Sequence, residues 1–347
     1  MQLPADIASN PGWYMLDYNP AYRKFIFTGL DETRFAEASF LDSRLNTRAD
    51  ALQGVTLADV DAVFPDRFEL PPAAYIFQVG HCGSTLLSRA LGATPDVLAL
   101  REPLPLRVLA NTRRELDDAL SWMSREEWRR LSTIILLALE RRFRPGQLPI
   151  IKASSTCNNL VEPVLGSHPG RRALLLYQPL ETSLAAMFRN RANFGDLRSQ
   201  GRDRLQEWLD LTGQQDMVLA GLEEDDVAVI SWIASLQRFE QARQRLPERV
   251  MMLDFNRFIA DPQDHLRRIA AFLGLDTQAE QLANAFANVS QRYAKNPGKP
   301  YSPERRQASL DNSRRRNAEG INRAMDKARA LLQTHPDMAG LEAYLEG

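Results

Sequence analysis

The sequence predicts an α/β fold: a three-layer, doubly wound parallel sheet with helices on both of its faces. Short apolar runs of strand length alternate along the chain with longer stretches of helical composition, the pattern of a parallel sheet covered by helices. The first run, Tyr75 to Val79, is almost continuously apolar, as expected of a strand buried on both faces. A glycine turn follows it from Gly80 to Thr85 and leads into a helix from Leu86 to Leu91. Such a turn directs backbone N–H groups and a helix dipole at one point, so it is a candidate site for phosphate or sulfate.

Composition sets the broad class. The chain has 347 residues, a net charge of −1 and a charged fraction of 25%, so nothing indicates a general attraction to nucleic acid or to a membrane surface. Two cysteines are too few for a disulfide framework and fit a reducing compartment. No apolar run approaches the ~20 residues of a membrane helix, and residues 1–10 lack the regions of a signal peptide. We expect a cytoplasmic protein without nucleic-acid or membrane partners.

The chain divides into three predicted parts. Residues 1–70 are expected to form an N-terminal subdomain packed on the core, with a strand at Lys24 to Thr28 and a helix capped by Asp31. Its tryptophans and tyrosines are interpreted as packing residues, with a pocket lining as the alternative. Residues 71–275 form the predicted core, and residues 276–347 a helical tail.

Four further strands are predicted in the core. They are Val97 to Leu100, Pro149 to Ala153, Ala173 to Tyr177 and Val250 to Phe255, and a helix from Trp128 to Arg142 lies between the first two. Polar side chains follow two of these strands, where ligands bind in such sheets. Glu102 is either a ligand at this edge or a surface carboxylate paired with Arg101 or Arg107. Lys152 is expected to be exposed at its strand tip, because an unpaired buried lysine is costly.

The glycine turn differs from the common nucleotide-binding loop. Ser84 follows Gly83 where that loop carries a lysine, which argues against a simple ATPase or kinase. A tight turn without a ligand is the alternative interpretation. Gly92 is expected to end the helix at a positive φ. Residues 193–204 are polar and contain two glycines, so they are interpreted as a mobile surface loop or lid.

Two segments resemble the sulfotransferase family, which has the fold of P-loop nucleoside triphosphate hydrolases. The run His81-Cys82-Gly83-Ser84-Thr85-Leu86-Leu87 is similar to the family's phosphosulfate loop, in which a basic residue precedes Ser-Gly-Thr-Thr and two large apolar residues. A strand, a turn, Asp261-Pro262 and a helix ending in Phe272-Leu273-Gly274-Leu275 resemble a second family signature. The chain is therefore identified as a divergent, bacterial-type member.

The resemblance implies an enzyme that moves a sulfuryl group from 3′-phosphoadenosine 5′-phosphosulfate to a hydroxyl or amine of a small-molecule or carbohydrate acceptor. The implied catalytic residues are His81 and Lys152, which carry positive charge, and Glu102, which takes the acceptor's proton because Ser154 stands where many members have a histidine. The implied cofactor-binding residues are Gly80, His81, Cys82, Gly83, Ser84, Thr85, Leu86, Ser183, Arg189 and Lys295.

The 3′-phosphate ligands depart from the family's pattern. Tyr177 and Ala185 occupy the positions of an arginine and a serine that normally hold this phosphate. Ser183 and Arg189 are the nearest substitutes. The basic tail, with Lys295, Lys299 and Arg305, either folds back over the cofactor or is a solvated basic face.

Two other functions are retained as alternatives. One is a P-loop nucleotide phosphotransferase or kinase, and the other is a non-catalytic nucleotide-binding member of the same fold. No group of His, Cys and carboxylates stands at metal-ligand spacing, so no metal is expected. No pattern in the sequence identifies the acceptor or the oligomeric state.

Overall fold

The computed structural model describes residues 3–45, 52–66, 73–116, 118–119, 121–214, 216–293, 296–300 and 302–346. The strands are β1 (Trp13–Asn19), β2 (Lys24–Gly29), β3 (Leu52–Thr56), β4 (Ala74–Gln78), β5 (Val97–Arg101), β6 (Leu148–Lys152), β7 (Arg172–Tyr177), β8 (Val250–Asp254), β9 (Arg292–Tyr293) and β10 (Asn296–Pro300). The helices are α1 (Glu32–Glu37), α2 (Leu57–Asp61), α3 (Ser84–Leu91), α4 (Leu104–Arg114), α5 (Arg125–Leu139), α6 (Val161–Gly166), α7 (Leu180–Phe188), α8 (Arg191–Ser199), α9 (Gly201–Thr212), α10 (Glu224–Arg245), α11 (Phe255–Ala260), α12 (Pro262–Leu273), α13 (Ala279–Ser290), α14 (Pro303–Arg316) and α15 (Ala318–Thr334).

A five-stranded sheet forms the centre of the molecule, with the order β5-β6-β4-β7-β8 and all neighbours parallel. β4 is fully buried, which agrees with its apolar sequence. From β4 the chain proceeds toward β5 on one side, and from β7 it proceeds toward β8 on the other. The carboxyl ends of β4 and β7 therefore mark a topological switch point, the usual place for a ligand in such a sheet.

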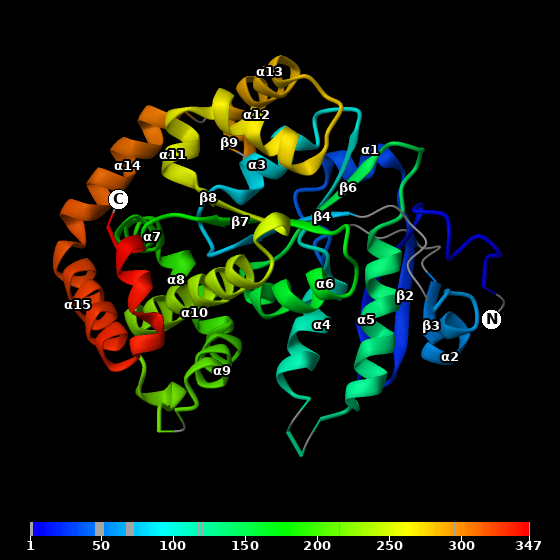
Figure 1. The fold of residues 1–347 in the computed structure, drawn as a ribbon, viewed down its shortest axis with the longest axis horizontal. Helices are drawn as coiled ribbons and strands as arrows, with labels where there is room; N and C mark the ends of the chain where they lie inside the picture. The colour runs from blue at the N-terminus through cyan, green and yellow to red at the C-terminus, as the bar shows by residue number, and fades with distance from the viewer. Residues whose placement is uncertain are drawn as a thin grey trace.

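Helices cover both faces of this sheet (Figure 1). α3, α12 and α13 lie on one face, while α6 and α10 lie on the other, and α4 and α5 continue that second layer. Their apolar residues join those of the strands in one core. The predicted three-layer, doubly wound α/β fold is thereby confirmed. Among the described residues, no helix is both long enough and apolar enough to cross a membrane.

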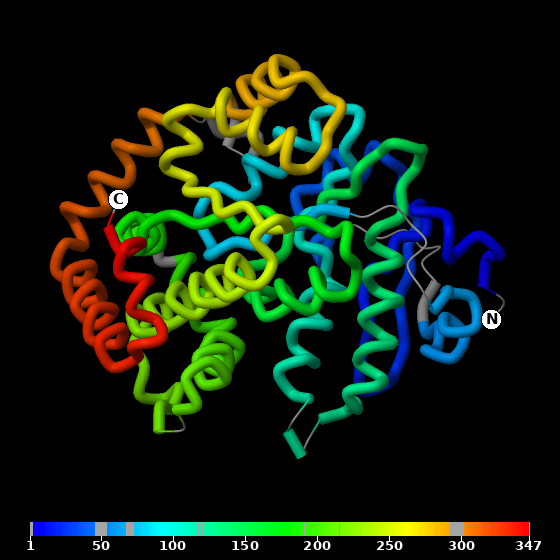
Figure 2. Tube along the Cα trace, in the orientation of Figure 1, coloured from blue at the N-terminus to red at the C-terminus, as the bar shows by residue number. Residues whose placement is uncertain are grey.

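The N-terminal segment forms a separate antiparallel sheet, β1-β2-β3, beside α5 (Figure 2). Two buried arginines of the core hold it by donating to main-chain carbonyls. Arg101 donates to the carbonyls of Phe35 (2.6 Å), Ala36 (2.7 Å) and Ala38 (2.7 Å). Arg141 donates to carbonyls near the N-terminus, among them Asn10 at 2.8 Å and Trp13 at 2.6 Å.

The C-terminal helices run back along the core and bring distant segments of the sequence to the sheet. α14 packs on α7, and α15 on α7 and α10 (Figure 1). The guanidinium of Arg314 binds both carboxylate oxygens of Glu181, at 2.7 and 2.9 Å. Near the end of the chain, Tyr344 meets Tyr177 edge to face, with ring centroids 5.1 Å apart. The predicted helical tail is thus docked at the side of β7.

Two local expectations were wrong. Gly92 has φ −73°, and a side chain is excluded there because a Cβ would lie 2.6 Å from the Cβ of Ala99. Residues 193–204 are not a loop: apart from Gln200, which joins the two helices, they form most of α8 and the start of α9. Asn190 caps α8 through Ala192 N (3.0 Å). Gly201 packs closely on Leu219, so both glycines of this segment are accommodated within helices.

Candidate active site

The glycine loop lies at the switch point and forms the floor of a cavity of about 180 Å³. The chain reverses between β4 and α3 through three residues with left-handed backbone, Gly80 (φ 89°), His81 (φ 53°) and Gly83 (φ 77°). Asn158 fixes the start of this turn by donating to the carbonyl of Gln78 at 3.0 Å. The first N–H groups of α3 lack intrahelical partners and, with the helix dipole, suit an anion.

Gly83 is required by a close contact as well as by its backbone. A Cβ at this position would lie 1.9 Å from the ring of Phe255, the residue that follows β8. Phe255 therefore presses on the loop from the neighbouring strand end. Only glycine fits both this approach and the positive φ.

Lys152 and Glu102 form an ion pair in the wall of the cavity. They stand at the ends of neighbouring strands, β6 and β5, and the Glu102 N–H donates to the Lys152 carbonyl at 2.7 Å. The Lys152 side chain is 1% exposed and that of Glu102 is 19% exposed. The expectation that Lys152 is exposed was wrong. Its partner Glu102, which offsets the cost of burying the ammonium, lies 50 residues earlier in the sequence. Glu102 thus pairs with the lysine at the end of the neighbouring strand.

The other candidate residues of the loop line the same cavity, which includes Gly80, His81, Cys82, Gly83, Ser84, Thr85 and Leu86. Two of them have partners within the fold. The Cys82 thiol faces Gln78 and the carbonyl of Leu176, each at 3.7 Å, and its burial raises its pKa to about 11. The Leu86 N–H donates to the Gly83 carbonyl at 2.9 Å, so it is engaged in the first turn of α3.

The three remaining candidates have different positions. Arg189 is exposed and lines the cavity from the end of α7. Ser183 is buried in α7 outside the cavity lining, and its hydroxyl has no hydrogen-bond partner among the described residues. Lys295 lies outside the described residues.

Arg306 reaches the cavity from α14 and was not among the candidates. Its guanidinium donates to Gln178 Oε1 at 3.0 Å and to Asn256 Oδ1 at 3.1 Å, and its central carbon lies 5.0 Å from the centre of the Phe255 ring. Gln178 in turn donates to the His81 carbonyl at 3.4 Å. The tail thus supplies a cation beside the glycine loop. The sequence has two adjacent arginines here, and Arg305, which was considered as a possible cofactor ligand, is exposed.

Arg204 is a second cation that sequence reasoning missed, since it falls in the segment interpreted as a loop. It lines the cavity from α9 and is only 9% exposed. It donates to Gln200 Oε1 at 2.7 Å, to Ser155 Oγ at 3.2 Å and to the hydroxyl of Ser231. Burial lowers its pKa to about 10, so it stays protonated at neutral pH.

Comparison with known proteins agrees with the second of the two sequence motifs. Residues 202–279 match the model of the sulfotransferase family. This segment, less than a quarter of the chain, is similar to the sulfotransferase family. The matched segment contains the Asp261-Pro262 turn and the Phe272 to Leu275 run that carried part of the resemblance. No protein of curated function matches this chain.

Solved structures similar to this chain include three at low identity. The sulfotransferase domain of the Synechococcus olefin synthase is 16% identical over 72% of this chain and 90% of its own, with a TM-score of 0.40. Sulfotransferase STF1 from Mycobacterium tuberculosis is 15% identical over 72% of this chain and 77% of its own, with a TM-score of 0.42. A mouse sulfotransferase complexed with PAP is 11% identical over 83% of this chain and 93% of its own, with a TM-score of 0.39.

Proposed function

We propose that this protein transfers a sulfuryl group from 3′-phosphoadenosine 5′-phosphosulfate to a hydroxyl or amine. The observation that carries the proposal is the Lys152–Glu102 pair, which lies in one cavity with an anion-binding glycine loop. Such a transfer needs a cradle for anionic groups, positive charge near the leaving oxygen and a base for the acceptor's proton. The similarity of residues 202–279 to the sulfotransferase family supports this class of chemistry.

The donor supplies a sulfuryl group bonded to a phosphate oxygen that leaves with negative charge. In our proposal the N–H groups of Ser84 and Thr85, together with the Thr85 hydroxyl, hold the phosphosulfate end. Lys152 and a protonated His81 stabilise charge on the leaving oxygen. Glu102 accepts the proton that the acceptor's O–H or N–H loses as the acceptor atom bonds to sulfur.

Arg306 and Arg189 are the residues that we propose for the nucleotide's second phosphate. The position held by Tyr177 cannot supply a cation, and Tyr177 packs against Tyr344 instead. Arg306 lies close to that strand end, because Gln178 is the residue directly after Tyr177. The contacts of Arg306 include two neutral amide oxygens and an aromatic ring, and in our proposal the phosphate adds charge-assisted bonds to its guanidinium.

Turnover of labelled donor with a panel of phenols, amines and sugars tests the proposal, with Glu102→Gln as the diagnostic variant. Loss of a general base lowers the rate by about 10²–10⁴, and we expect a decrease of that size. Glu162→Gln is a matched control, because Glu162 is also partly buried and ion-paired, with Arg245 at 2.6 Å, but lies outside the cavity lining. Wild-type turnover in Glu102→Gln would refute the role of Glu102. Full activity in His81→Ala would remove His81 from the mechanism.

A non-catalytic nucleotide-binding role is the second candidate, favoured by one observation. Neither Tyr177 nor the buried Ala185 can replace the phosphate ligands that the family carries at these positions. Tight nucleotide binding without turnover of any acceptor class would support this alternative over the enzyme.

A further inference from the structure

Two cations approach the glycine loop from opposite sides. Arg306 lies over Phe255 and beside Gln178, at the ends of β8 and β7. Arg204 contacts Ser155, which lies three residues after Lys152 on the β6 side of the loop. Ser155 also lies beside Gly80, where an added Cβ would be 3.6 Å from its hydroxyl oxygen. Arg204 is therefore on the side of the cavity that holds Lys152 and Glu102.

The partners of Arg204 are all uncharged. Within the part of the chain that the structure describes, its guanidinium binds two serine hydroxyls and one amide oxygen, and its Nε has no hydrogen-bond partner. Asp196 and Asp203 influence it only at longer range and form no ion pair with it among these residues. A buried charge without a counter-ion is costly to the fold, and such a cost is typical of functional sites.

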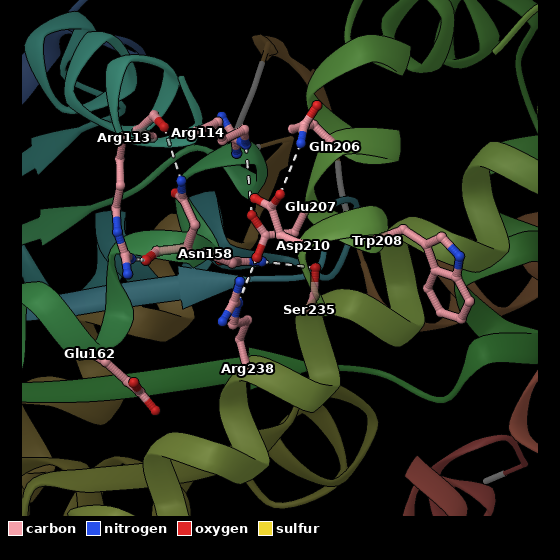
Figure 3. A network of polar contacts seen from close by, with 12 residues as sticks. Arg113, Arg114, Asn158, Glu162, Gln206, Glu207, Trp208, Asp210, Ser235 and Arg238 are labelled. Atoms are coloured by element: carbon pink, nitrogen blue, oxygen red, sulfur yellow. Dashed lines mark hydrogen bonds and ion pairs between the residues drawn. The ribbon is translucent and has the colours of Figure 1, made fainter. Parts of the chain in front are cut away.

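Unlike Arg204, the neighbouring Arg114 and Arg238 share a carboxylate, that of Glu207 (Figure 3). Glu207 stands on α9 one helical turn after Arg204, yet it reaches Arg238 at 2.6 Å and Arg114 at 3.6 Å. The one buried carboxylate of this network is thus shared by two other cations. Among the described residues no carboxylate forms an ion pair with Arg204, and Arg114 adds repulsion to it.

We propose that Arg204 binds an anionic group of the acceptor, so that the substrates of this protein are hydroxyl or amine compounds that also carry a carboxylate, sulfate or phosphate. The proposal deepens the proposed function and rests on it. The acceptor's nucleophile would face Lys152 and Glu102, while its anionic group would occupy the side of the cavity near Ser155 and Ser231. The N–H groups of Arg204 match such planar or tetrahedral oxyanions in bidentate fashion.

The test measures binding of matched compounds to protein saturated with adenosine 3′,5′-bisphosphate, which in the proposed function occupies the glycine loop. The probes are 4-hydroxybenzoate against 4-hydroxybenzamide and glucuronate against glucose, by calorimetry or ligand-observed NMR. For at least one pair we expect the wild type to bind the anionic member about 10-fold or more tightly, as a charge-assisted hydrogen bond gives. Arg204→Gln should remove this preference, and Arg204→Lys should restore part of it.

Arg202→Gln is the matched control, because Arg202 lies two residues away on α9, is 78% exposed and contacts Glu115 at 3.6 Å. It should keep the anionic preference. Arg204→Gln should also retain or raise the melting temperature, since it removes an uncompensated buried charge. A wild type without anionic preference, or a preference that survives Arg204→Gln, would overturn the proposal. Loss of stability in Arg204→Gln without any change in preference would assign Arg204 a structural role.

The same titrations separate this inference from the proposed function. Wild-type bisphosphate affinity in Arg204→Gln, with the anionic preference gone, supports both. If the wild type does not bind the bisphosphate at all, the sulfotransferase proposal fails, whatever the probes show. If bisphosphate binds but the probe pairs are not distinguished, only the assignment of Arg204 fails.

Discussion

The exposed fractions of Lys152 and Glu102 predict which substitution in this ion pair lowers the free energy of unfolding more. Replacing Glu102 with Met leaves a lysine ammonium that is 1% exposed without its carboxylate, and such an orphaned buried charge costs ~3–5 kcal/mol. Replacing Lys152 with Met leaves a carboxylate that is 19% exposed. Water in the cavity can reach that carboxylate, so we expect a smaller loss of ~1–2 kcal/mol.

The double variant should be more stable than Glu102→Met alone, because replacing a buried pair with apolar residues of similar size is often close to neutral. Urea unfolding followed by circular dichroism gives the four free energies of a double-mutant cycle, and we expect a coupling energy of ~1–3 kcal/mol. Equal losses in the two single variants, or strictly additive losses in the double variant, would contradict the account. Either result would mean that water already screens the pair.

Two further predictions concern the glycine loop and the thiols. Gly83→Ala should lose several-fold more stability than Gly146→Ala: both have positive φ (77° and 79°), which costs ~1–2 kcal/mol, but only Gly83 would also push into Phe255. Equal melting temperatures would exclude that contact. Cys82 and Cys157 should resist iodoacetamide at pH 8 in the native protein and react in urea, as mass spectrometry can measure, because burial raises their pKa values to about 11 and about 12. The unfolded thiols ionise first, near pH ~8.5, so the free energy of unfolding should fall as pH rises through ~9–11; an alkaline rise in stability would contradict this sign.

The fold could be predicted because its signals are local. The apolar run at Tyr75, the glycine turn and the helix after it depend on residues that are adjacent in the sequence, and the structure has them as β4, the loop and α3. The meeting of Glu102 and Lys152 depends instead on the order of the strands. Because β5 and β6 are neighbours, the two side chains lie together at one edge of the sheet. That order is not written in any single segment, which is why Lys152 was expected to be exposed.

The missed cations have a different cause. Arg204 lies among polar residues and two glycines, and this composition is typical of a loop, but tertiary packing on α10 holds the segment as helix. Arg306 reaches the cavity because the C-terminal helix α14 docks on α7, which lies more than 100 residues earlier in the sequence. A basic run alone does not tell which of its residues faces inward, so Arg305 and Arg306 could not be distinguished before the helix was placed. The division of the chain into three parts stays a prediction.

Binding of the spent donor tests the central claim most directly. Adenosine 3′,5′-bisphosphate and magnesium ATP are titrated separately into the wild type, Arg306→Gln and Arg305→Gln, where Arg305 is the adjacent and exposed arginine. We predict bisphosphate binding with a Kd on the order of micromolar, weakened ~10–100-fold in Arg306→Gln by the loss of charge-assisted bonds and unchanged in Arg305→Gln. Tight binding of magnesium ATP with no binding of the bisphosphate would contradict the account and would leave a nucleotide phosphotransferase as the better explanation of the same loop.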